Sequence, residues 1–332
     1  MCIRDSGNTL VLSIDIKLQA LVEQLFGDRR GALVAIDPRN GEVLAFVSKP
    51  SFDPNLFVDG IDVESWRGLN ESLDKPLLNR ALRGTYPPGS TFKPFMAIAA
   101  LNSGKRGPVT IVHDGGSYNF GGHVFRSHGD HGLGPVDMRR SIVASSNVYY
   151  YSLANELGVD LMHEQLLPFG FGRKTGIDLD GESIGLLPSQ AWKRRAYKRP
   201  ELQKWYPGET ISVAIGQGAV TVSPMAMAMM MATVGNGGTL QTPHLVKAVD
   251  RGQGKGWEPV PPPNPRSTFV MAPDHLAAVR EGLWMAVNTP MGTATRRGKI
   301  DGKDVSGKTG TCLLYTSPSP RDRTRSRMPS SA

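Results

Sequence analysis

Hydrophobic and polar residues alternate at the start of the chain and then change to a helical period. Residues 9–14 alternate as in a strand, and apolar residues recur at three- and four-residue spacing over Ile16–Phe26, as on one face of a helix. Two apolar runs follow, at residues 33–36 and 43–46, with an Asn-Gly pair in the turn between them. Asn-Gly between apolar runs is a strong hairpin signal. The pattern therefore predicts a strand, a helix and a β-hairpin.

The rest of the chain predicts helices between strands that lie far apart in the sequence. Periodic apolar segments predict helices over residues 89–102, 137–157, 224–234 and 272–287, the second of them broken in its middle. Apolar runs predict strands over residues 210–215 and 305–311, whereas the Gly- and His-rich residues 113–134 are expected to form a loop. We therefore expect an α+β fold, in which helices cover one sheet built from distant segments and an all-helical subdomain is inserted in it.

Composition excludes several other classes of protein. Hydrophobic residues make up 39% of the 332 residues, enough to bury a sizeable core, and the 38 glycines and 25 prolines are too few for collagen or a low-complexity disordered chain. The most apolar stretch, residues 225–234, is ten residues long. A helix that crosses a membrane needs about 20 apolar residues, so no membrane span is expected within this sequence.

The two ends of the chain differ from the rest. Residues 1–6 and the Ser-, Pro- and Arg-rich residues 312–332 lack apolar periodicity, and we interpret both as foreign ends. The only two cysteines, Cys2 and Cys312, lie there, so no disulfide or thiol chemistry is expected in the body of the chain. The net charge is +8, of which the C-terminal end contributes +3. The body, residues 7–311, lacks clustered basic and aromatic residues, so nucleic acid is not an expected partner.

Candidate chemistry appears first in the segment YPPGSTFKPF, residues 86–95. Ser90 and Lys93 are three residues apart, a spacing that places a hydroxyl and an amine on one face of a helix. A serine in a first helical turn has unpaired N–H groups and the positive end of the helix dipole beside it, which favour a developing oxyanion. Lysine acts as a base only where burial or a second cation disfavours its ammonium form. The chemistry therefore requires another cation in the site.

The same spacing also arises by chance. Ser72 and Lys75 repeat it, but no glycine precedes them and Pro76 follows at once. We interpret this second pair as part of a solvated loop.

A second element, Ser145 and Asn147, lies in the middle of the helix predicted over residues 137–157. A hydroxyl and an amide at this spacing can relay a proton and hold a substrate amide. The same residues can equally cap a broken helix. The pair therefore adds to the hypothesis only in combination with other motifs.

A third element is the strand-like run that contains Lys308, Thr309, Gly310 and Thr311. Its glycine allows a substrate backbone to lie against the strand, its hydroxyls can bind a carboxylate, and Lys308 supplies the second cation. Residues 174–176 repeat the Lys-Thr-Gly triplet, but they follow a glycine-rich loop and are expected to form a turn.

Ser-x-x-Lys, Ser-x-Asn and Lys-Thr-Gly in this order resemble the signature of penicillin-binding proteins and class A β-lactamases. The segments IDPRNGEVLAFVSKPSFDPN, LLNRALRGTYPPGSTFKP and IGQGAVTVSP resemble class B penicillin-binding transpeptidases, and the resemblance covers residues 8–311. The segment WKRRAYKRPELQKWYPGETISVAIGQG is most similar to the enzymes of cell elongation in rod-shaped bacteria, with the septal enzymes of cell division next. The resemblance implies a penicillin-binding transpeptidase or β-lactamase-like fold.

The resemblance also implies catalytic roles. Ser90 is expected to form an acyl-enzyme with the penultimate D-alanine of a peptidoglycan stem peptide ending in D-Ala-D-Ala, after Lys93 takes its proton. Ser145 is expected to pass a proton to the leaving nitrogen, and Asn147 to orient the substrate amide and Lys93. β-Lactams are expected to bind covalently to Ser90.

Binding roles follow in the same way. The resemblance implies that Lys308, Thr309 and Thr311, with Gly310 between them, receive the terminal carboxylate of the substrate. The backbone N–H groups of Ser90 and Thr311 are expected to form the oxyanion hole.

The resemblance implies a cellular setting as well. Expected partners are glycan-polymerising and shape-determining membrane proteins of the elongation machinery, at the periplasmic face of the bacterial inner membrane, with the membrane anchor outside this chain. The family continues beyond Thr311 with further core strands and a closing helix. We therefore expect the C-terminal strands of the sheet to be missing here and this chain to fold poorly by itself.

Some members of the family are thought to bind zinc through acidic, histidine and cysteine ligands. Four histidines and two aspartates lie close together in this chain, at His113, Asp114, His123, His128, Asp130 and His131. Asp114 and His131 match two ligand positions, but Ser146 stands where a cysteine is needed, and serine is a poor zinc ligand. We expect no cofactor and a solvated polar loop here, with zinc at Asp114 and His131 as the alternative.

Two other functions stay open at this point. A β-lactamase of the same fold needs a group that activates water, and Glu182 is the only candidate between the second and third motifs. A β-lactam sensor or inactive scaffold belongs to a different class of function. Intact Ser90, Lys93 and Lys308 argue against an inactive scaffold, but a sensor would keep them.

Overall fold

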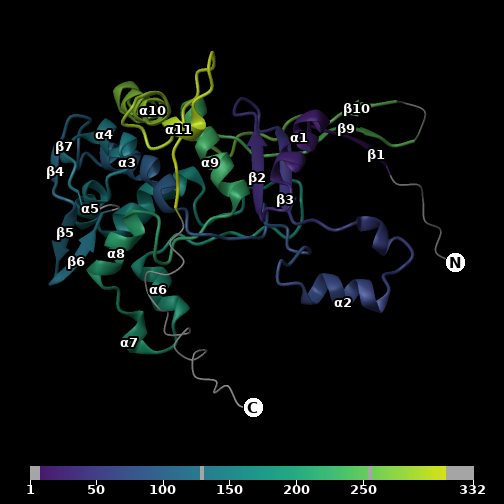
Figure 1. Ribbon diagram of the computed structural model, residues 1–332, viewed down its shortest axis with the longest axis horizontal. Helices are drawn as coiled ribbons and strands as arrows, with labels where there is room; N and C mark the ends of the chain where they lie inside the picture. Colours follow the sequence, from purple (N-terminus) through teal and green to yellow (C-terminus); the bar gives the residue numbers. More distant parts are fainter. Residues whose placement is uncertain (1–7, 128–130, 253–255, 312–332) are drawn as a thin grey trace.

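The computed structural model describes residues 8–127, 131–252 and 256–311 (Figure 1). The interpretation of residues 1–6 and 312–332 as foreign ends, and the candidates His128 and Asp130, lie outside the described residues. The first elements are β1 (Thr9–Leu12), α1 (Ile16–Phe26), β2 (Gly31–Ile36) and β3 (Val43–Lys49). This order confirms the predicted strand, helix and hairpin.

The hairpin forms because its turn contains a residue that tolerates a left-handed backbone. Gly41 has φ +86°, and β2 pairs with β3 in an antiparallel register that places Gly31 opposite Lys49. The two strands form a sheet of their own. Val43, Ala45 and Val47 point from β3 into the core, because successive side chains of a strand lie on opposite faces.

Strands that lie far apart in the sequence pair with each other, as expected, but the partner of the first strand is a segment that was not predicted as a strand. β1 pairs antiparallel with β9 (Val246–Asp250), and β9 pairs with β10 (Glu258–Pro259). β8 (Thr239–Leu240) pairs with β11 (Ser267–Thr268). No sheet among the described residues has more than three strands, so the single large sheet that we predicted is here a set of small sheets.

The main core surrounds one helix that is buried on all sides. The 3-10 turn η2 (Gly89–Phe92) leads directly into α3 (Lys93–Asn102), and residues 93–101 are all buried. Phe95 packs edge-on against Phe169 and Phe171, with ring centroids 5.2 and 5.1 Å apart. Burial and these ring contacts hold the start of α3 rigidly.

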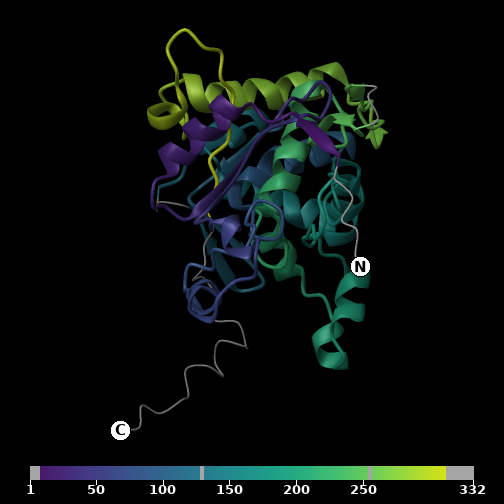
Figure 2. The same cartoon turned by 90° about the vertical axis from the view of Figure 1, so that its right-hand side faces the viewer.

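Further helices complete the body of the molecule. They are α4 (Met138–Val143), α5 (Asn147–Leu166), η3 (Leu167–Phe169), α8 (Pro207–Ala214), α9 (Pro224–Asn236), α10 (Pro273–Asn288) and α11 (Thr295–Gly298). Figure 2 shows α10 running across the top of the molecule, above α9. α4 and α5 are the two halves of the helix predicted over residues 137–157, and the predicted break lies at Ser145, which has φ +55°.

The expected loop over residues 113–134 was wrong, because the segment forms two short hairpins. β4 (Val112–Asp114) pairs with β7 (Gly134–Val136), and β5 (Ser117–Phe120) pairs with β6 (His123–Arg126). Gly121 and Gly122 have positive φ and close the inner turn, and the Phe125 ring packs 5.6 Å from that of Tyr151 on α5. The inserted subdomain is therefore not all-helical.

The strands predicted over residues 210–215 and 305–311 were also wrong. Residues 210–214 belong to α8, because Pro207 starts the helix and the Glu209 carboxylate caps it by accepting from the Tyr206 N–H (3.0 Å). Residues 305–311 form no ladder with any described strand. The Gly307 N–H donates to Leu283 on α10 instead (3.1 Å), and Asn288 donates to the Val305 carbonyl (2.8 Å).

Two helical arms project from the body. One carries η1 (Pro54–Phe57) and α2 (Val63–Glu71), and the other carries α6 (Gln190–Ala196) and α7 (Pro200–Gln203), as Figures 1 and 2 show. α2 has no buried residue. Among the described residues, no helix combines the length and apolar character that a membrane crossing needs.

Candidate active site

Ser90 and Lys93 lie one turn apart where η2 meets α3. The Lys93 backbone N–H donates to the Ser90 carbonyl, which fixes the turn between them. Ser90 lines a cleft of about 460 Å³, whereas the Lys93 side chain is fully buried behind it. The predicted serine therefore lines the cleft, and the predicted lysine lies buried one turn further along the chain.

The Lys93 ammonium position is surrounded by the α4–α5 turn. Its Nζ lies 2.7 Å from the Ser145 carbonyl oxygen, 2.7 Å from Asn147 Oδ1 and 3.1 Å from Ser145 Oγ. The first two atoms only accept hydrogen bonds, so when the amine is neutral they take its two hydrogens. The lone pair of that amine is then free for a hydroxyl, which is what a general base requires.

Lys308 supplies the second cation that the sequence required. Its Nζ donates to Ser145 Oγ (2.9 Å) and to the Thr309 carbonyl (3.1 Å), although 163 residues separate Lys308 from Ser145. Burial lowers the pKa of Lys93 well below its ordinary value, and the charge of Lys308 lowers it further, while the charge of Asp114 acts in the opposite direction. Burial also lowers the pKa of Lys308, to about 8.

The Lys-Thr-Gly segment borders the same cleft. Thr309 and Thr311 line it, and Thr309 Oγ1 donates to Thr293 Oγ1 (3.1 Å). A Cβ on Gly310 would lie 2.7 Å from Thr91 Cγ2 and 3.0 Å from the Pro88 carbonyl oxygen, so only glycine allows this approach to the nucleophile turn. The structure thus brings together all three predicted motifs.

A turn that the motifs did not identify joins the nucleophile to this segment. Gly89 donates its N–H to the Gly216 carbonyl (2.8 Å), and the Gln217 amide donates to the Thr311 carbonyl (3.0 Å). A Cβ on Gly89 would lie 2.3 Å from the Thr311 oxygen, and one on Gly216 would lie 2.2 Å from the Gly89 oxygen. Gly216 and Gln217 therefore fix the spacing of Ser90 and Thr311. In the sequence, Gly216 and Gln217 could be noticed only as part of the segment IGQGAVTVSP, which resembles the family.

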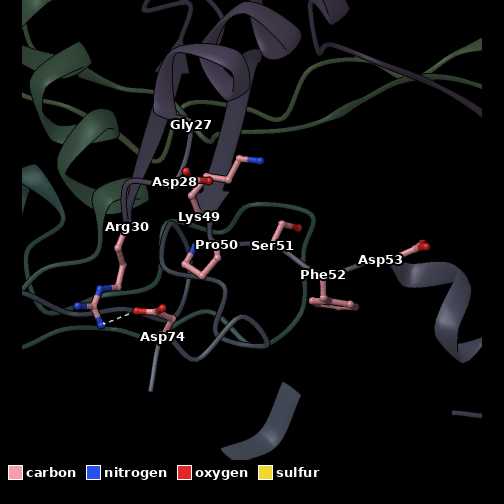
Figure 3. A pocket seen from close by; sticks show the side chains of 9 residues that line it. All are labelled: Gly27, Asp28, Arg30, Lys49, Pro50, Ser51, Phe52, Asp53 and Asp74. Carbon is pink, nitrogen blue, oxygen red and sulfur yellow. Dashed lines mark ion pairs between the residues drawn. The ribbon is translucent and has the colours of Figure 1, made fainter. Parts of the chain in front are cut away.

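The competing serine–lysine pair lies elsewhere. Ser72 ends α2, Lys75 has φ +46° in a turn, and neither residue lines the cleft. Figure 3 shows a separate hollow beside this segment, where Asp74 forms an ion pair with Arg30 (3.2 Å). These contacts agree with the interpretation of residues 72–75 as a solvated loop.

The second Lys-Thr-Gly triplet and Glu182 are hydrogen-bonded to each other. Glu182 accepts from the Thr175 N–H (2.7 Å) and the Gly176 N–H (3.4 Å), and none of the three lines the cleft. The carboxylate expected to activate water in a β-lactamase is therefore used to hold a turn.

The residues that the structure describes do not fit a zinc site. Asp114 Oδ2 accepts from Ser146 Oγ (2.6 Å) and Oδ1 accepts from the Gly116 N–H (2.8 Å), so both carboxylate oxygens are engaged. His131 lines the cleft, and His113 is exposed on β4. Within the described ranges, no group of three His, Cys, Asp or Glu side chains is placed to bind a metal ion.

Comparison with known proteins identifies the family. The family described as penicillin binding protein transpeptidase domain matches residues 31–327. The chain belongs to this family of transpeptidase domains. Its fold is accordingly the mixed α+β penicillin-binding transpeptidase fold, as the sequence resemblance implied.

Individual relatives are similar over most of this chain. Peptidoglycan D,D-transpeptidase MrdA of Acinetobacter baumannii is 42% identical over 310 residues, which are 93% of this chain and 45% of the relative. The crystal structure of Pseudomonas aeruginosa PBP2 in complex with WCK 5153 superposes with a TM-score of 0.86 at 41% identity, covering 93% of this chain and 66% of that one.

A third relative is PBP2 of Helicobacter pylori, whose structure in complex with MreC has a TM-score of 0.80 at 30% identity and covers 92% of this chain and 55% of that one. The chain spans about half the length of the curated relatives that it matches.

Proposed function

We propose that this chain carries the catalytic domain of a peptidoglycan D,D-transpeptidase that works through a serine acyl-enzyme. The observation that carries the proposal is the contact between Ser145 Oγ and the amines of both Lys93 and Lys308, in the cleft that Ser90 lines. One amine is buried and the other partly exposed, which supports a base and a cation in one site.

In the acylation step, Ser90 Oγ attacks the carbonyl carbon of the penultimate D-alanine while its proton moves to Lys93 Nζ. The C–O bond of an ester forms, and the C–N bond to the terminal D-alanine breaks. The proton then passes through Ser145 Oγ to the leaving nitrogen, and D-alanine departs as a free amine. The position of Ser145 between the two amines supports this relay.

Substrate binding uses the opposite wall of the cleft. The Lys308 ammonium and the hydroxyls of Thr309 and Thr311 receive the terminal carboxylate, and the N–H groups of Ser90 and Thr311 receive the oxyanion. Gly89 and Gly216 support this role, because their close approaches set the distance between the two N–H groups.

In the second step, an amine from a neighbouring stem peptide attacks the ester carbon. A new amide bond forms, the C–O bond to Ser90 breaks, and the serine regains its proton from the attacking amine through Lys93. A β-lactam presents a strained amide to the same groups. The ring opens on Ser90 and no fragment leaves, so the enzyme stays acylated.

The relatives support a cellular role in elongation. PBP2 of Helicobacter pylori is described in a complex with MreC, and a further similar structure is described as a peptidoglycan synthase complex that couples polymerisation and crosslinking. We propose that the natural protein acts in cell elongation at the periplasmic face of the inner membrane, together with membrane proteins that polymerise glycan and determine shape. A role in septal division is the second candidate.

The same site is proposed to need no resident cofactor. A buried lysine supplies the base and backbone N–H groups stabilise the oxyanion, so each step has a group that performs it. The engaged oxygens of Asp114 support this part of the proposal. Metal analysis of the natural protein, purified without chelator, tests it: stoichiometric zinc contradicts it.

The proposed reaction is tested with a synthetic stem peptide that ends in D-Ala-D-Ala, together with a second stem as the acceptor. The natural protein that contains this sequence is expected to release one D-alanine per peptide bond formed, and the Ser90→Ala variant is expected to release none. Persistence of the acyl-enzyme for minutes to hours supports a transpeptidase over a β-lactamase. Hydrolysis of a penicillin with sub-second turnover contradicts the proposal.

A further inference from the structure

One buried carboxylate performs no step of the mechanism described above, although its charge raises the pKa of Lys93. Asp114 lies at the end of β4 and is 1% exposed. Its Oδ1 accepts from the Gly116 N–H (2.8 Å), which is a local turn, whereas its Oδ2 accepts from Ser146 Oγ (2.6 Å), 32 residues away. A buried carboxylate is costly unless it is hydrogen-bonded, so its contact with Ser146 is a strong restraint.

Ser146 stands between the two residues that contact Lys93. Its own Oγ accepts from the Tyr149 N–H (3.1 Å) and so caps α5, and its N–H donates to the Ser141 carbonyl (3.1 Å). Because Ser146 is 1% exposed, its hydroxyl hydrogen requires a protein acceptor, and that acceptor is Asp114.

The conformation of the neighbouring residue needs such a restraint. Ser145 has φ +55°, a left-handed backbone that costs about 1–2 kcal/mol in a residue with a Cβ. This conformation directs both its carbonyl oxygen and its hydroxyl to Lys93 Nζ. A turn held only by the helix behind it can relax to an ordinary backbone and withdraw one of these two atoms.

We propose that Asp114 is a positioning residue for the catalytic lysine: through Ser146, it holds the α4–α5 turn in the conformation that presents Ser145 and Asn147 to Lys93. The inference rests on the proposed function, because it assigns Asp114 to the same site. It gives the β4–β7 hairpin a role in catalysis, although neither Asp114 nor Ser146 lines the cleft.

The test measures acylation of the natural protein by a fluorescent penicillin in a stopped-flow instrument, over a range of penicillin concentrations. Ser146→Ala and Asp114→Asn are each expected to lower the limiting acylation rate about 10- to 100-fold, the cost of a misplaced catalytic group. The apparent Kd of the non-covalent complex is expected to stay unchanged, because both residues lie outside the cleft. Ser146→Thr keeps the hydroxyl and is expected to recover the rate to within about threefold, since threonine also caps helices.

A matched control variant separates the positioning role of Ser146 from its role as a helix cap. Ser189 is buried and caps α6 by accepting from the Trp192 N–H (3.0 Å), as Ser146 caps α5. Ser189→Ala is expected to lower the melting temperature about as much as Ser146→Ala, through loss of a similar cap. Its acylation rate is expected to equal that of the unsubstituted protein.

The outcomes are distinct. A normal limiting rate in Ser146→Ala, measured below its melting temperature, overturns the inference, because the serine is then only a cap. If Asp114→Asn does not fold, the comparison of Ser146→Ala, Ser146→Thr and Ser189→Ala decides the inference alone. No acylation of the unsubstituted protein overturns the proposed function instead.

Discussion

Two lysines beside one cleft must differ in charge for the proposed reaction. Lys93 accepts a proton only when neutral, whereas Lys308 binds a carboxylate only when protonated. Burial and the neighbouring cation lower the pKa of Lys93, and burial lowers that of Lys308 to about 8. Activity therefore requires a pH above the pKa of Lys93 and below that of Lys308.

The acylation rate is accordingly expected to have a bell-shaped pH profile. It rises as increasing pH removes the proton from Lys93, well below the usual range of a lysine, and falls above about pH 8 as Lys308 loses its proton. The measurement is kcat/KM for acylation by a penicillin between pH 5 and pH 10. A rate that still rises through pH 10 contradicts both pKa assignments.

Lys308→Met tests which group sets the lower limb of this profile. The substitution removes a cation that lowers the pKa of Lys93, so that pKa is expected to rise and the limb to move to higher pH. The overall rate is expected to fall as well, because the carboxylate loses its cation. If the lower limb of the pH profile stays at the same pH, Lys308 does not lower the pKa of Lys93.

At this scale, local spacing indicates the candidate serine and lysine, the resemblance supplies their roles, and neither identifies the residues that support them. Ser90 and Lys93 follow from a three-residue spacing, and the need for a second cation led to Lys308. Gln217 could not be predicted in this way, because its contact with Thr311 joins segments 94 residues apart. The segment that contains Gln217 entered the sequence analysis only through its resemblance to class B penicillin-binding transpeptidases.

At the scale of elements, the turn before α3 depends on glycine. Gly89→Ala is expected to lower the acylation rate by about 100-fold, because the new Cβ lies 2.3 Å from the Thr311 oxygen and displaces Thr311, whose N–H is proposed to form half of the oxyanion hole. The rate is measured with a fluorescent penicillin.

Gly104→Ala is the control for this prediction. Gly104 has φ +68° at the end of α3, but a Cβ there has no atom within 4 Å. It is expected to cost about 1 kcal/mol of unfolding free energy without affecting acylation. Equal losses of rate in the two variants contradict the proposed geometry.

An ion pair with one buried partner, Arg106, joins α5 to the segment that follows α3. Arg106 donates to Glu156 through Nε (2.9 Å) and Nη2 (2.5 Å), and the Arg106 side chain is 2% exposed while that of Glu156 is 40% exposed. Glu156→Ala leaves a buried guanidinium without its counter-charge, and we expect a loss of about 2 kcal/mol in the free energy of unfolding by urea. Glu281→Ala removes the partner of Arg139 on the surface and is expected to cost at most about 0.5 kcal/mol. Equal losses of unfolding free energy in the two variants contradict the claim that burial of Arg106 makes its ion pair the more important one.

Secondary structure was predicted correctly where the apolar periodicity extends over a long segment. It was predicted wrongly where contacts with other elements determine the conformation. The helices α9 and α10 each begin at a proline and appear within two residues of the predicted bounds. α8 was predicted as a strand because its residues are β-branched and apolar, but Pro207 and packing against α5 select a helix. The β5–β6 hairpin is too short to be recognised without the aromatic rings that it packs against.

At the scale of the whole molecule, the sheets are small and partly uncovered. β2 and β3 form a two-stranded sheet, and α1 against it exposes Ile16, Leu21 and Leu25. Two-stranded sheets are marginally stable in water unless other elements cover them. The helical core around α3, by contrast, is densely packed.

The 332-residue chain expressed alone is therefore expected to unfold without a single cooperative transition. Circular dichroism during heating measures this, and a hydrophobic dye is expected to bind near α1 before the helices melt. A sharp two-state transition, together with labelling by a fluorescent penicillin, contradicts the prediction.

The central claim is that a neutral Lys93 makes the Ser90 hydroxyl reactive toward an acyl donor. Intact-mass spectrometry after incubation with benzylpenicillin, followed by peptide mapping, measures this directly. The natural protein is expected to gain the mass of one whole penicillin on the peptide that contains Ser90, and Ser90→Ala is expected to gain none. An unmodified protein, or an adduct that persists in Ser90→Ala, contradicts the claim.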